Sequence, residues 1–300
     1  MPASGAGSEN QDARPGDRGG TRPGTSLRDQ VAVVTGGASG IGAALVRAIA
    51  AQGGTVVIAD VDEAAAKAAA TEVNAALAGP AGGEPVSTAT LDVRDASAVA
   101  DLVAQVAAGF GQLDYMFNNA GIAVGGMVEE LTLGHWDRVI DVNVRGVIHG
   151  VHAAYPVMLR QGHGHIVNTA SLAGLVPGPM LAPYAAAKHA VVGLSLSLRA
   201  EAAGRGVRVS AVCPGFVDTP LLGRVNPDLP RTQTGTNAAA LARLTGRLYR
   251  AAPLAQDVLR GVARNRAVIV APARARVAWR VTRYAPGLAM RAATSAVRRG

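Results

Sequence analysis

The chain has 300 residues, of which 49% are hydrophobic, and this is enough for one large α/β domain with a sizeable core. Of its 29 basic residues, ten lie in residues 258–300, a stretch without acidic residues, so the rest of the chain is nearly neutral. This distribution argues against a nucleic-acid-binding core. The single cysteine, Cys213, excludes an intrachain disulfide and fits a reducing, cytoplasmic compartment, and its apolar neighbours indicate a buried position.

The first 27 residues are rich in Gly, Pro, Ser, Asp and Arg and show no hydrophobic periodicity. They lack the apolar core of a signal peptide, so we expect a disordered leader before a domain at residues 28–271. No apolar run in the sequence reaches about 18 residues, and we therefore expect no transmembrane helix.

A glycine-rich turn follows the first expected strand. Residues 31–35 form an apolar, β-branched run that predicts a buried strand, and residues 43–49 have a helical pattern. Between them, Gly36, Gly40 and Gly42 would let the backbone approach a pyrophosphate, which the free N–H groups at the helix start would bind. The spacing G-x-x-x-G-x-G differs from the common G-x-G-x-x-G, so the loop alone is weak evidence for a dinucleotide site.

An acidic residue ends the second expected strand, residues 55–60. Asp60 lies 18 residues after Gly42, where a carboxylate would bind the ribose hydroxyls of NAD and repel the 2′-phosphate of NADP. The alternative is that Asp60 only caps the next helix, for which Asp62 is the better candidate. We therefore expect NAD rather than NADP.

Strands and helices alternate along the chain. Helices are expected at residues 62–77 and 96–107, and strands at residues 86–91 and 114–118. This order predicts βαβ units and a doubly wound, Rossmann-like parallel sheet in a single domain with three αβα layers. The carboxyl ends of the strands then meet at one edge, where ligands bind. The residues expected at this edge are Asp92, Asn118, Asn119 and Gly121.

The middle of the chain combines a long helical region with an apolar loop. Residues 132–160 are expected to be helical, with Asn143 at an unfavourable mid-helix position. His163 and His165 are interpreted as turn residues, because no further ligand completes a metal site. Residues 172–183 are uncharged and mostly apolar, which favours either the wall of a lipophilic substrate pocket or a packed loop.

Tyr184 and Lys188 lie one helical turn apart, so the ammonium would lie beside the phenol. A unit charge at ~4 Å and an effective dielectric of ~20 contributes up to about 4 kcal/mol. That energy would lower the tyrosine pKa from about 10 toward ~7, where the phenol could take or give a proton. Ser171, thirteen residues before Tyr184, ends a strand at the ligand edge. The alternatives are a solvated pair on a helix and a serine that caps a turn.

Together these motifs resemble the short-chain dehydrogenase/reductase family, in its NAD-preferring single-domain branch, over residues 30 to 271. The resemblance implies an NAD-dependent oxidoreductase that interconverts a secondary alcohol and a ketone. It implies that Tyr184 is the catalytic acid or base and that Ser171 binds the substrate oxygen. Lys188 would lower the pKa of Tyr184 and bind the nicotinamide ribose, and Asn143 would help to hold a water that relays protons.

The resemblance also implies the residues that bind the cofactor. The Val217 backbone and the Thr219 hydroxyl would contact the nicotinamide carboxamide. Residues 221–250 fit the mobile segment that covers the substrate, and residues 185–201 a helix that often forms a subunit interface, so we expect a homo-oligomer. No metal ligand is implied. The implied set is Gly36, Ser39, Gly40, Ile41, Gly42, Asp60, Asp92, Val93, Asn119, Ala120, Gly121, Tyr184, Lys188, Pro214, Gly215, Val217 and Thr219.

A basic extension follows at residues 272–300. Val277, Val281, Tyr284 and Leu288 recur at i, i+4, i+7 and i+11, between offset arginines, and Pro286 should break the helix. Such a helix would contact a membrane surface, a neighbouring subunit or its own domain. Two rival functions stay open: an NADP-dependent carbonyl reductase, and a dinucleotide-binding sensor or scaffold without turnover.

Overall fold

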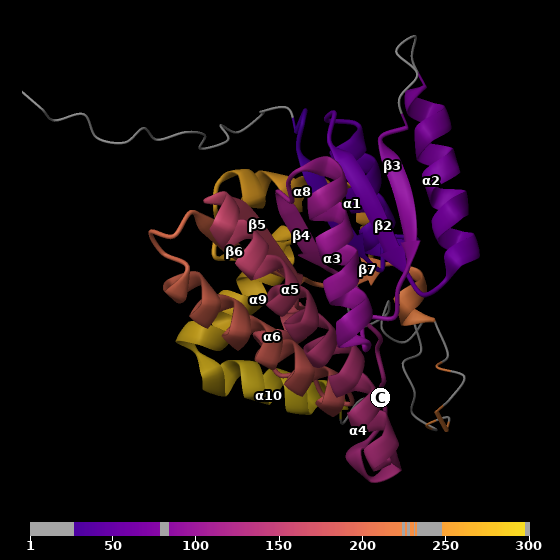
Figure 1. Cartoon of the computed structure of the whole chain (residues 1–300). Coiled ribbons are helices and arrows are strands. Elements are labelled where there is room, and N and C mark those ends of the chain that lie inside the picture. The colour runs from indigo at the N-terminus through magenta and orange to yellow at the C-terminus, as the bar shows by residue number, and fades with distance from the viewer. Residues whose placement is uncertain are drawn as a thin grey trace, which may run out of the picture.

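The computed structural model describes residues 27–78, 84–223, 226, 229–230, 232 and 248–297 (Figure 1). The predicted leader lies outside the described residues except for Leu27, and so does most of the predicted covering segment at residues 221–250. In the described part of the chain, no helix is long and apolar enough to cross a membrane.

Within the described residues, seven parallel strands form one sheet in the order β3-β2-β1-β4-β5-β6-β9, and β7 and β8 pair separately. The strand order reverses between β1 and β4, and ligands bind at such a reversal in doubly wound sheets. The predicted fold class is confirmed. The strands are β1 (Val31–Thr35), β2 (Thr55–Asp60), β3 (Val86–Thr90), β4 (Tyr115–Asn118), β5 (Gly164–Thr169), β6 (Val207–Pro214), β7 (Val217–Asp218), β8 (Tyr249–Arg250) and β9 (Val268–Ala271).

Helices cover both faces of the sheet. On one face, Leu45 of α1 and Leu254 of α8 pack into the same core as α2. On the other face, Val103 of α3 and Met158 of α5 belong to a second core, and α6 lies beside them, in front of the sheet in Figure 1. The longer helices are α1 (Gly40–Ala50), α2 (Glu63–Leu77), α3 (Ala96–Phe110), α4 (Leu133–Ile140), α5 (Gly146–Gln161), α6 (Ala182–Glu201), α8 (Ala251–Ala263), α9 (Ala273–Tyr284) and α10 (Pro286–Val297).

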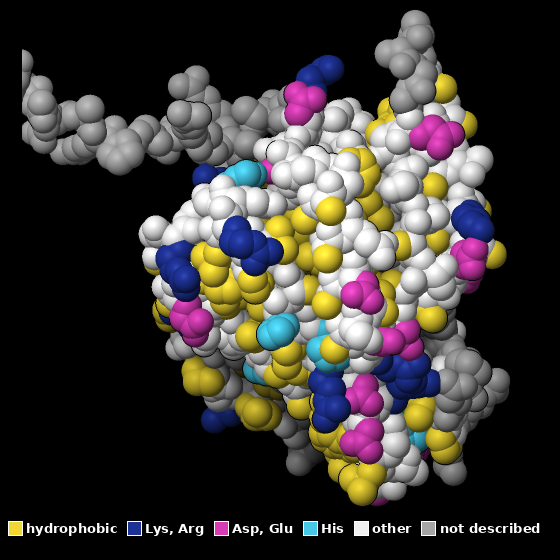
Figure 2. Space-filling model, viewed as in Figure 1, with side chains coloured by type: hydrophobic (Ala, Val, Ile, Leu, Met, Phe, Trp, Pro, Cys, Tyr) yellow, Lys and Arg dark blue, Asp and Glu magenta, His cyan; other side chains and the backbone are white. Residues whose placement is uncertain are grey.

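The strands are buried because both faces of the sheet are covered. All five residues of β1 are buried, as expected for a parallel strand between two helical layers. The outer surface of the α3, α5 and α6 layer is mixed, with hydrophobic side chains scattered between polar ones (Figure 2). Phe110, Ile148 and Leu196 are exposed there by 48%, 43% and 40%.

The helical region expected at residues 132–160 is present, but it is not one regular α-helix. A π-helical turn at Asp141–Arg145 separates α4 from α5, and the Gly146 N–H donates to the Asp141 carbonyl across five residues. Such π-turns insert one extra residue into a helix and are frequent at functional sites. The inserted turn includes Asn143, which is buried.

The interpretation of His165 as a turn residue is also wrong. His165 lies within β5 and is 3% exposed, and its Nε2 is 2.8 Å from the Ser210 hydroxyl on β6. His163 is exposed at the turn before β5, with its Nε2 3.3 Å from Asp114. The expected buried position of Cys213 is confirmed, since that residue has no exposed surface.

The extension forms two helices that meet at Ala285. α9 ends at Tyr284 and α10 begins at Pro286, so the predicted break at this proline is confirmed. In Figure 1 both helices lie at the lower left, beside α6. The predicted domain boundary after Ala271 coincides with the end of β9.

Candidate active site

The loop between β1 and α1 has room only for glycine at three of its positions. Gly36 and Gly40 have φ values of 63° and 55°, in the left-handed region that favours glycine. A Cβ at Gly42 would lie 2.0 Å from the Gly36 carbonyl oxygen, and one at Gly36 would lie 2.8 Å from the Ala120 Cα. The three predicted glycines therefore form a tight turn whose backbone a ligand could approach closely.

The N-terminus of α1 is open to an anion. Ser39 is the N-cap residue, but its side chain makes no capping hydrogen bond, and the first turn contains no acidic residue. The N–H groups of Ile41 and Gly42 thus keep the positive end of the helix dipole facing the loop. This donor set fits a pyrophosphate, as the sequence predicted.

Asp60 lies at the end of β2, directly beside the glycine loop. Its Oδ2 accepts a hydrogen bond from the Ala38 N–H at 3.0 Å, and its Oδ1 accepts one from the Asp62 N–H at 3.1 Å. The capping alternative does not apply to Asp60, because Asp62 is the N-cap of α2 and accepts from the Ala65 N–H at 3.0 Å. The Asp60 carboxylate is therefore fixed at the position predicted to bind the adenosine ribose.

The end of β4 is tied to the glycine loop through Thr35. The Thr35 hydroxyl accepts from the backbone N–H groups of Asn119 and Ala120 at 2.9 and 3.0 Å. The Asn119 amide in turn donates to the carbonyls of Thr35 and Gly36 at 3.0 and 3.2 Å. These bonds hold the edges of β1 and β4 together at the point where the strand order reverses.

Asn143 reaches from the π-turn to the segment after β4. Its side chain is fully buried and pairs with both backbone groups of Ile122: Oδ1 accepts from the N–H and Nδ2 donates to the carbonyl, each at 2.9 Å. A Cβ at Gly121 would lie 3.0 Å from Asn143 Oδ1 and 3.5 Å from Lys188 Nζ. Gly121 therefore allows the asparagine and the lysine to approach the same point.

Lys188 is a buried cation whose ammonium has one backbone partner. The side chain is 3% exposed, and Nζ donates to the Thr169 carbonyl at 2.8 Å. Burial lowers the pKa of Lys188 to about 8, because the charged form loses its hydration. Nζ also lies 5.6 Å from the centre of the Tyr184 ring, so the predicted proximity of the two side chains is present.

The expected lowering of the Tyr184 pKa is absent from this structure. Burial raises the pKa of Tyr184, and a side-chain hydrogen bond with Ser171 opposes that rise only in part. The Lys188 ammonium is directed to Thr169 and is itself easier to deprotonate, so its effect on the phenol is small. Tyr184 is therefore a protonated phenol at neutral pH, beside the Ser171 hydroxyl.

Cys213 lies beneath these side chains at the end of β6. Burial raises the pKa of its thiol to about 12, and the thiol is near enough to affect both Tyr184 and Lys188. It receives a backbone hydrogen bond from Ser171. An inert, neutral thiol at this point packs the floor of the site and is not a nucleophile.

The remaining predicted cofactor residues lie at the same edge of the sheet. Pro214 ends β6, the Gly215 N–H donates to the Ala271 carbonyl at 2.8 Å, and Val217 is buried in β7. Thr219 lies against the glycine loop, since a Cβ at Gly40 would lie 3.2 Å from the Thr219 Cβ.

Asp92 and Val93 follow β3 on the other side of the reversal. A hydrogen bond with Arg94 lowers the pKa of the Asp92 carboxyl. The Val93 carbonyl is 2.8 Å from His149 Nδ1 on α5. Both residues thus have protein partners.

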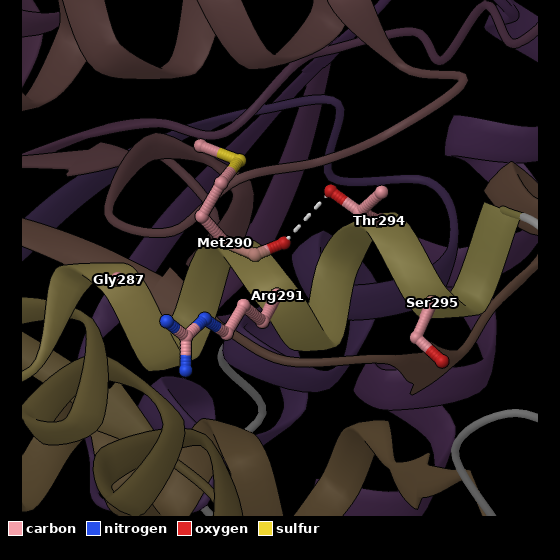
Figure 3. A pocket seen from close by; sticks show the side chains of 5 residues that line it. All are labelled: Gly287, Met290, Arg291, Thr294 and Ser295. Atoms are coloured by element: carbon pink, nitrogen blue, oxygen red, sulfur yellow. Dashed lines mark hydrogen bonds between the residues drawn. The ribbon is translucent and has the colours of Figure 1, made fainter.

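A shallow pocket lies elsewhere, on the outside of α10 (Figure 3). Gly287, Met290, Arg291, Thr294 and Ser295 line it, and all five belong to this one helix. None of the predicted site residues lines it. Among the described residues no cluster of three or more His, Cys, Asp or Glu side chains could hold a metal ion.

A family model described as short chain dehydrogenase matches residues 30–230, about two thirds of the chain. This chain belongs to the short-chain dehydrogenase family. The family assignment made from the motifs is confirmed, and the protein is an oxidoreductase. The matched residues include the glycine loop, Asp60, Asn143 and the segment from Ser171 to Lys188.

Two curated relatives of this short-chain dehydrogenase are named as dehydrogenases of small hydroxylated compounds. A D-beta-hydroxybutyrate dehydrogenase of Rhizobium meliloti is 38% identical over 204 residues, which are 68% of this chain and 78% of the relative. A cyclohexanol dehydrogenase of an Acinetobacter species is 40% identical over 197 residues, which are 65% of this chain and 76% of the relative.

Solved structures of the family share the fold over nearly their whole length. A short-chain dehydrogenase/reductase from Burkholderia phymatum, solved in complex with NAD, superposes with a TM-score of 0.77 at 33% identity. The match covers 88% of this chain and 96% of that one. Its cofactor agrees with the one predicted from Asp60.

Two residues that support this short-chain dehydrogenase site were missed in the sequence. Thr169 accepts the Lys188 hydrogen bond through its carbonyl and donates to Asn119 Oδ1 at 3.3 Å through its hydroxyl. Ile122 supplies both backbone partners of Asn143. The sequence marks Thr169 only weakly, as a polar residue at the end of an expected strand. It does not mark Ile122 at all, because that residue acts through its backbone.

Proposed function

We propose that this chain interconverts a secondary alcohol and a ketone with NAD bound across the glycine loop and Asp60. The carrying observation is that Asn143, Ser171, Tyr184 and Lys188 lie close together although they come from three separate parts of the fold: the π-turn, the end of β5 and α6. When bound, NAD supplies the carbon that accepts or gives the hydride. The side chains of the protein orient the substrate and transfer the proton.

Each of the four side chains has a role that its surroundings support. The Ser171 hydroxyl binds the substrate oxygen next to the Tyr184 phenol. Burial raises the pKa of Tyr184, so its phenol can donate a proton to the ketone oxygen in the direction of reduction. In oxidation the phenol would first give its proton to the relay water, and the resulting phenolate would then take the proton of the alcohol. Lys188 binds the ribose of the nicotinamide half, and Asn143 shapes the segment after β4 and helps to hold a relay water.

NAD is favoured over NADP by the fixed carboxylate of Asp60. Both of its oxygens already accept backbone N–H groups, so the side chain cannot swing away to admit a phosphate without losing two hydrogen bonds. A 2′-phosphate at this position would meet a negative charge.

The substrate is proposed to be lipophilic. Residues 172–183 contain no charged side chain and follow Ser171 directly, and Leu172 and Leu175 pack partly against the core near Cys213. An apolar wall beside a hydroxyl-binding serine favours a hydrophobic alcohol, since few polar groups are then left without partners.

The first test is turnover of a panel of secondary alcohols, from short polar ones to steroid-sized ones, followed by the absorbance of NADH. We expect turnover to be fastest with apolar members and to fall by about 10²-fold or more in Tyr184→Phe, which keeps the ring and removes the acid–base group. Tyr155→Phe on α5 is the matched control and should keep its rate. NAD binding without turnover of any panel member would favour a dinucleotide sensor instead.

Self-association is proposed through the α5 and α6 layer. Ile148 on α5 and Leu196 on α6 are large, apolar and about two-fifths exposed, and both helices belong to the layer that Figure 2 views. Sedimentation velocity should show a dimer or tetramer, and Ile148→Glu with Leu196→Glu should shift it toward monomer. A wild-type monomer at micromolar concentration would contradict this.

A further inference from the structure

The basic extension attaches to the domain through only one side of α9. Ala275 is 2% exposed and Trp279 is partly buried, and both pack with Val191 of α6 and Val270 of β9. The Arg276 guanidinium donates to the Val270 carbonyl at 3.1 Å. These contacts fix α9 along the edge strand of the sheet.

Three of the four members of the apolar row found in the sequence are exposed, and only Val281 is partly buried. Val277 and Tyr284, seven residues apart on α9, are 58% and 78% exposed. On α10, Leu288 and Met290 are 60% and 55% exposed. Large side chains left in water over two consecutive helices form a patch that lacks a partner within the described residues.

The same outer surface is purely basic. Arg280, Arg283 and Arg291 are exposed and form no ion pair within the part of the chain that the structure describes. No acidic residue occurs anywhere after Asp257 in the sequence. Hydrophobic and basic side chains both appear at the lower left of Figure 2, where Figure 1 has α9 and α10. Positive charge is therefore mixed with exposed apolar groups, without local neutralisation.

The shallow pocket on α10 combines the same two chemistries. Figure 3 shows Met290 and Thr294 on one side of the helix and Arg291 and Ser295 on the other, with Gly287 leaving space at one end. Thr294 donates its hydroxyl proton to the Met290 carbonyl at 3.0 Å, so its oxygen remains an acceptor. Arg291 and Ser295 supply donors suited to a phosphate oxygen next to an apolar side chain.

An anionic lipid surface matches this face better than the alternatives. A second copy docked by the same face would bring two sets of unneutralised arginines together, at a cost in repulsion. Nucleic acid would leave Leu288 and Met290 without apolar partners. A bilayer interface offers phosphates at the depth of the arginine head groups and acyl carbon just below them.

We propose that α9 and α10 bind the surface of an anionic phospholipid bilayer. Val277, Tyr284 and Leu288 enter the boundary between head groups and acyl chains. Arg280, Arg283 and Arg291 bind lipid phosphates. The binding is peripheral, and it places a short-chain dehydrogenase domain next to the membrane in which apolar alcohols dissolve.

Co-sedimentation of the full chain with vesicles tests this without any substrate. We expect pelleting with phosphatidylglycerol–phosphatidylcholine vesicles, little with phosphatidylcholine alone, and release at high salt. Arg280→Gln with Arg283→Gln and Arg291→Gln should lower the partition coefficient by about tenfold or more. A variant with the same loss of charge elsewhere, Arg160→Gln with Arg205→Gln and Arg264→Gln, should pellet nearly as wild type.

Tyr284→Ser with Leu288→Ser separates the apolar contribution from the charge. This variant should lose most anionic binding, while its circular dichroism and melting temperature stay close to wild type because both side chains are exposed. Equal pelleting of the two arginine variants would overturn the proposal, and so would absence of pelleting at low salt. If sedimentation velocity instead shows that Tyr284→Ser with Leu288→Ser dissociates a wild-type dimer, the face belongs to a second copy and the proposal fails.

Discussion

At the scale of single residues, the site depends on side chains that have one backbone partner each and little freedom. Asn143 forms its hydrogen bonds with the Ile122 backbone, and Lys188 donates to the Thr169 carbonyl. Each is buried, so loss of either would leave a backbone group unpaired, at a cost of about 1–3 kcal/mol. The site is thus preorganised before any ligand binds.

Asp60 and its neighbour Asp62 give a matched pair of substitutions. Asp60→Ala should weaken NAD binding by about tenfold, ~1.4 kcal/mol, and raise the preference for NADP. The substitution removes a negative charge together with the two carboxylate oxygens that accept the backbone N–H groups of Ala38 and Asp62. Asp62→Ala removes the N-cap of α2 and should cost about 1 kcal/mol of stability without changing cofactor preference. Binding of each dinucleotide, followed by titration calorimetry, measures both effects.

The cofactor interpretation of Asp60 would be wrong if the ratio of the two affinities stayed the same in Asp60→Ala. A change of that ratio in Asp62→Ala would also count against it, since the effect would then come from disturbing the start of α2. Thermal melting of both variants shows how much of any loss in affinity reflects the fold.

At the scale of elements, the sequence predicts strands better than helix interruptions. The strands β1 and β2 have the predicted bounds, because short β-branched runs between glycines have few other solutions. The break between α4 and α5 was missed, because the hydrophobic period on either side of Asp141–Arg145 remains helical. A π-turn differs from an α-helical turn by one extra residue, and no residue type in the segment marks that insertion.

The extension shows a second limit of pattern reasoning. Its period predicted an amphipathic helix and its proline predicted the break, and both are present. The row Val277, Tyr284 and Leu288 would ordinarily be assigned to the buried side of such a helix. The buried side instead carries Ala275 and Trp279, which pack in one cluster with Val191 of α6 and Val270 of the edge strand β9. The hydrophobic period of a helix therefore does not show which side of the helix packs against the rest of the domain.

The pKa of Tyr184 shows the same limit at the level of electrostatics. Charge spacing along a helix is visible in a sequence, and it places Lys188 near the phenol correctly. The sequence does not show how completely each side chain is buried. In this fold, burial raises the pKa of Tyr184 and lowers that of Lys188, so it opposes the ionisation of both groups. The sequence therefore predicts which groups meet, whereas their protonation follows from how completely the fold removes water.

At the scale of the whole molecule, one buried histidine links folding to pH. His165 lies in the centre of the sheet and has a pKa lowered to about 3 by burial, helped by the charges of Arg208 and Arg199. Its Nε2 donates to Ser210, whose own proton goes to the Arg266 carbonyl at 2.6 Å. The folded state therefore holds this imidazole neutral, without a place for a second proton.

The sign of the resulting pH dependence follows from linkage. An unfolded histidine titrates near 6.5, so below that pH the unfolded chain binds a proton that the folded chain does not. The contribution of His165 to stability is complete above pH 6.5 and falls, by up to about 1.4 kcal/mol per pH unit, as the pH drops toward about 3. Lys188 titrates above this window. Hydrogen bonds with Arg94 and Ser97 lower the pKa values of Asp92 and Asp95, away from the range between pH 5 and pH 7, whereas burial raises the pKa of Asp114.

Urea unfolding between pH 7 and pH 5 isolates the histidine. We expect the wild-type free energy of unfolding to fall by about 2 kcal/mol over this range. His165→Gln, which can still bond to Ser210, should have a shallower slope whatever its absolute stability. His163→Gln is the control, because that imidazole is exposed beside Asp114 and its loss leaves the buried site intact. Equal slopes in wild type and His165→Gln would mean that a different group carries the pH dependence, and the neutral imidazole in the sheet would then contribute nothing to it.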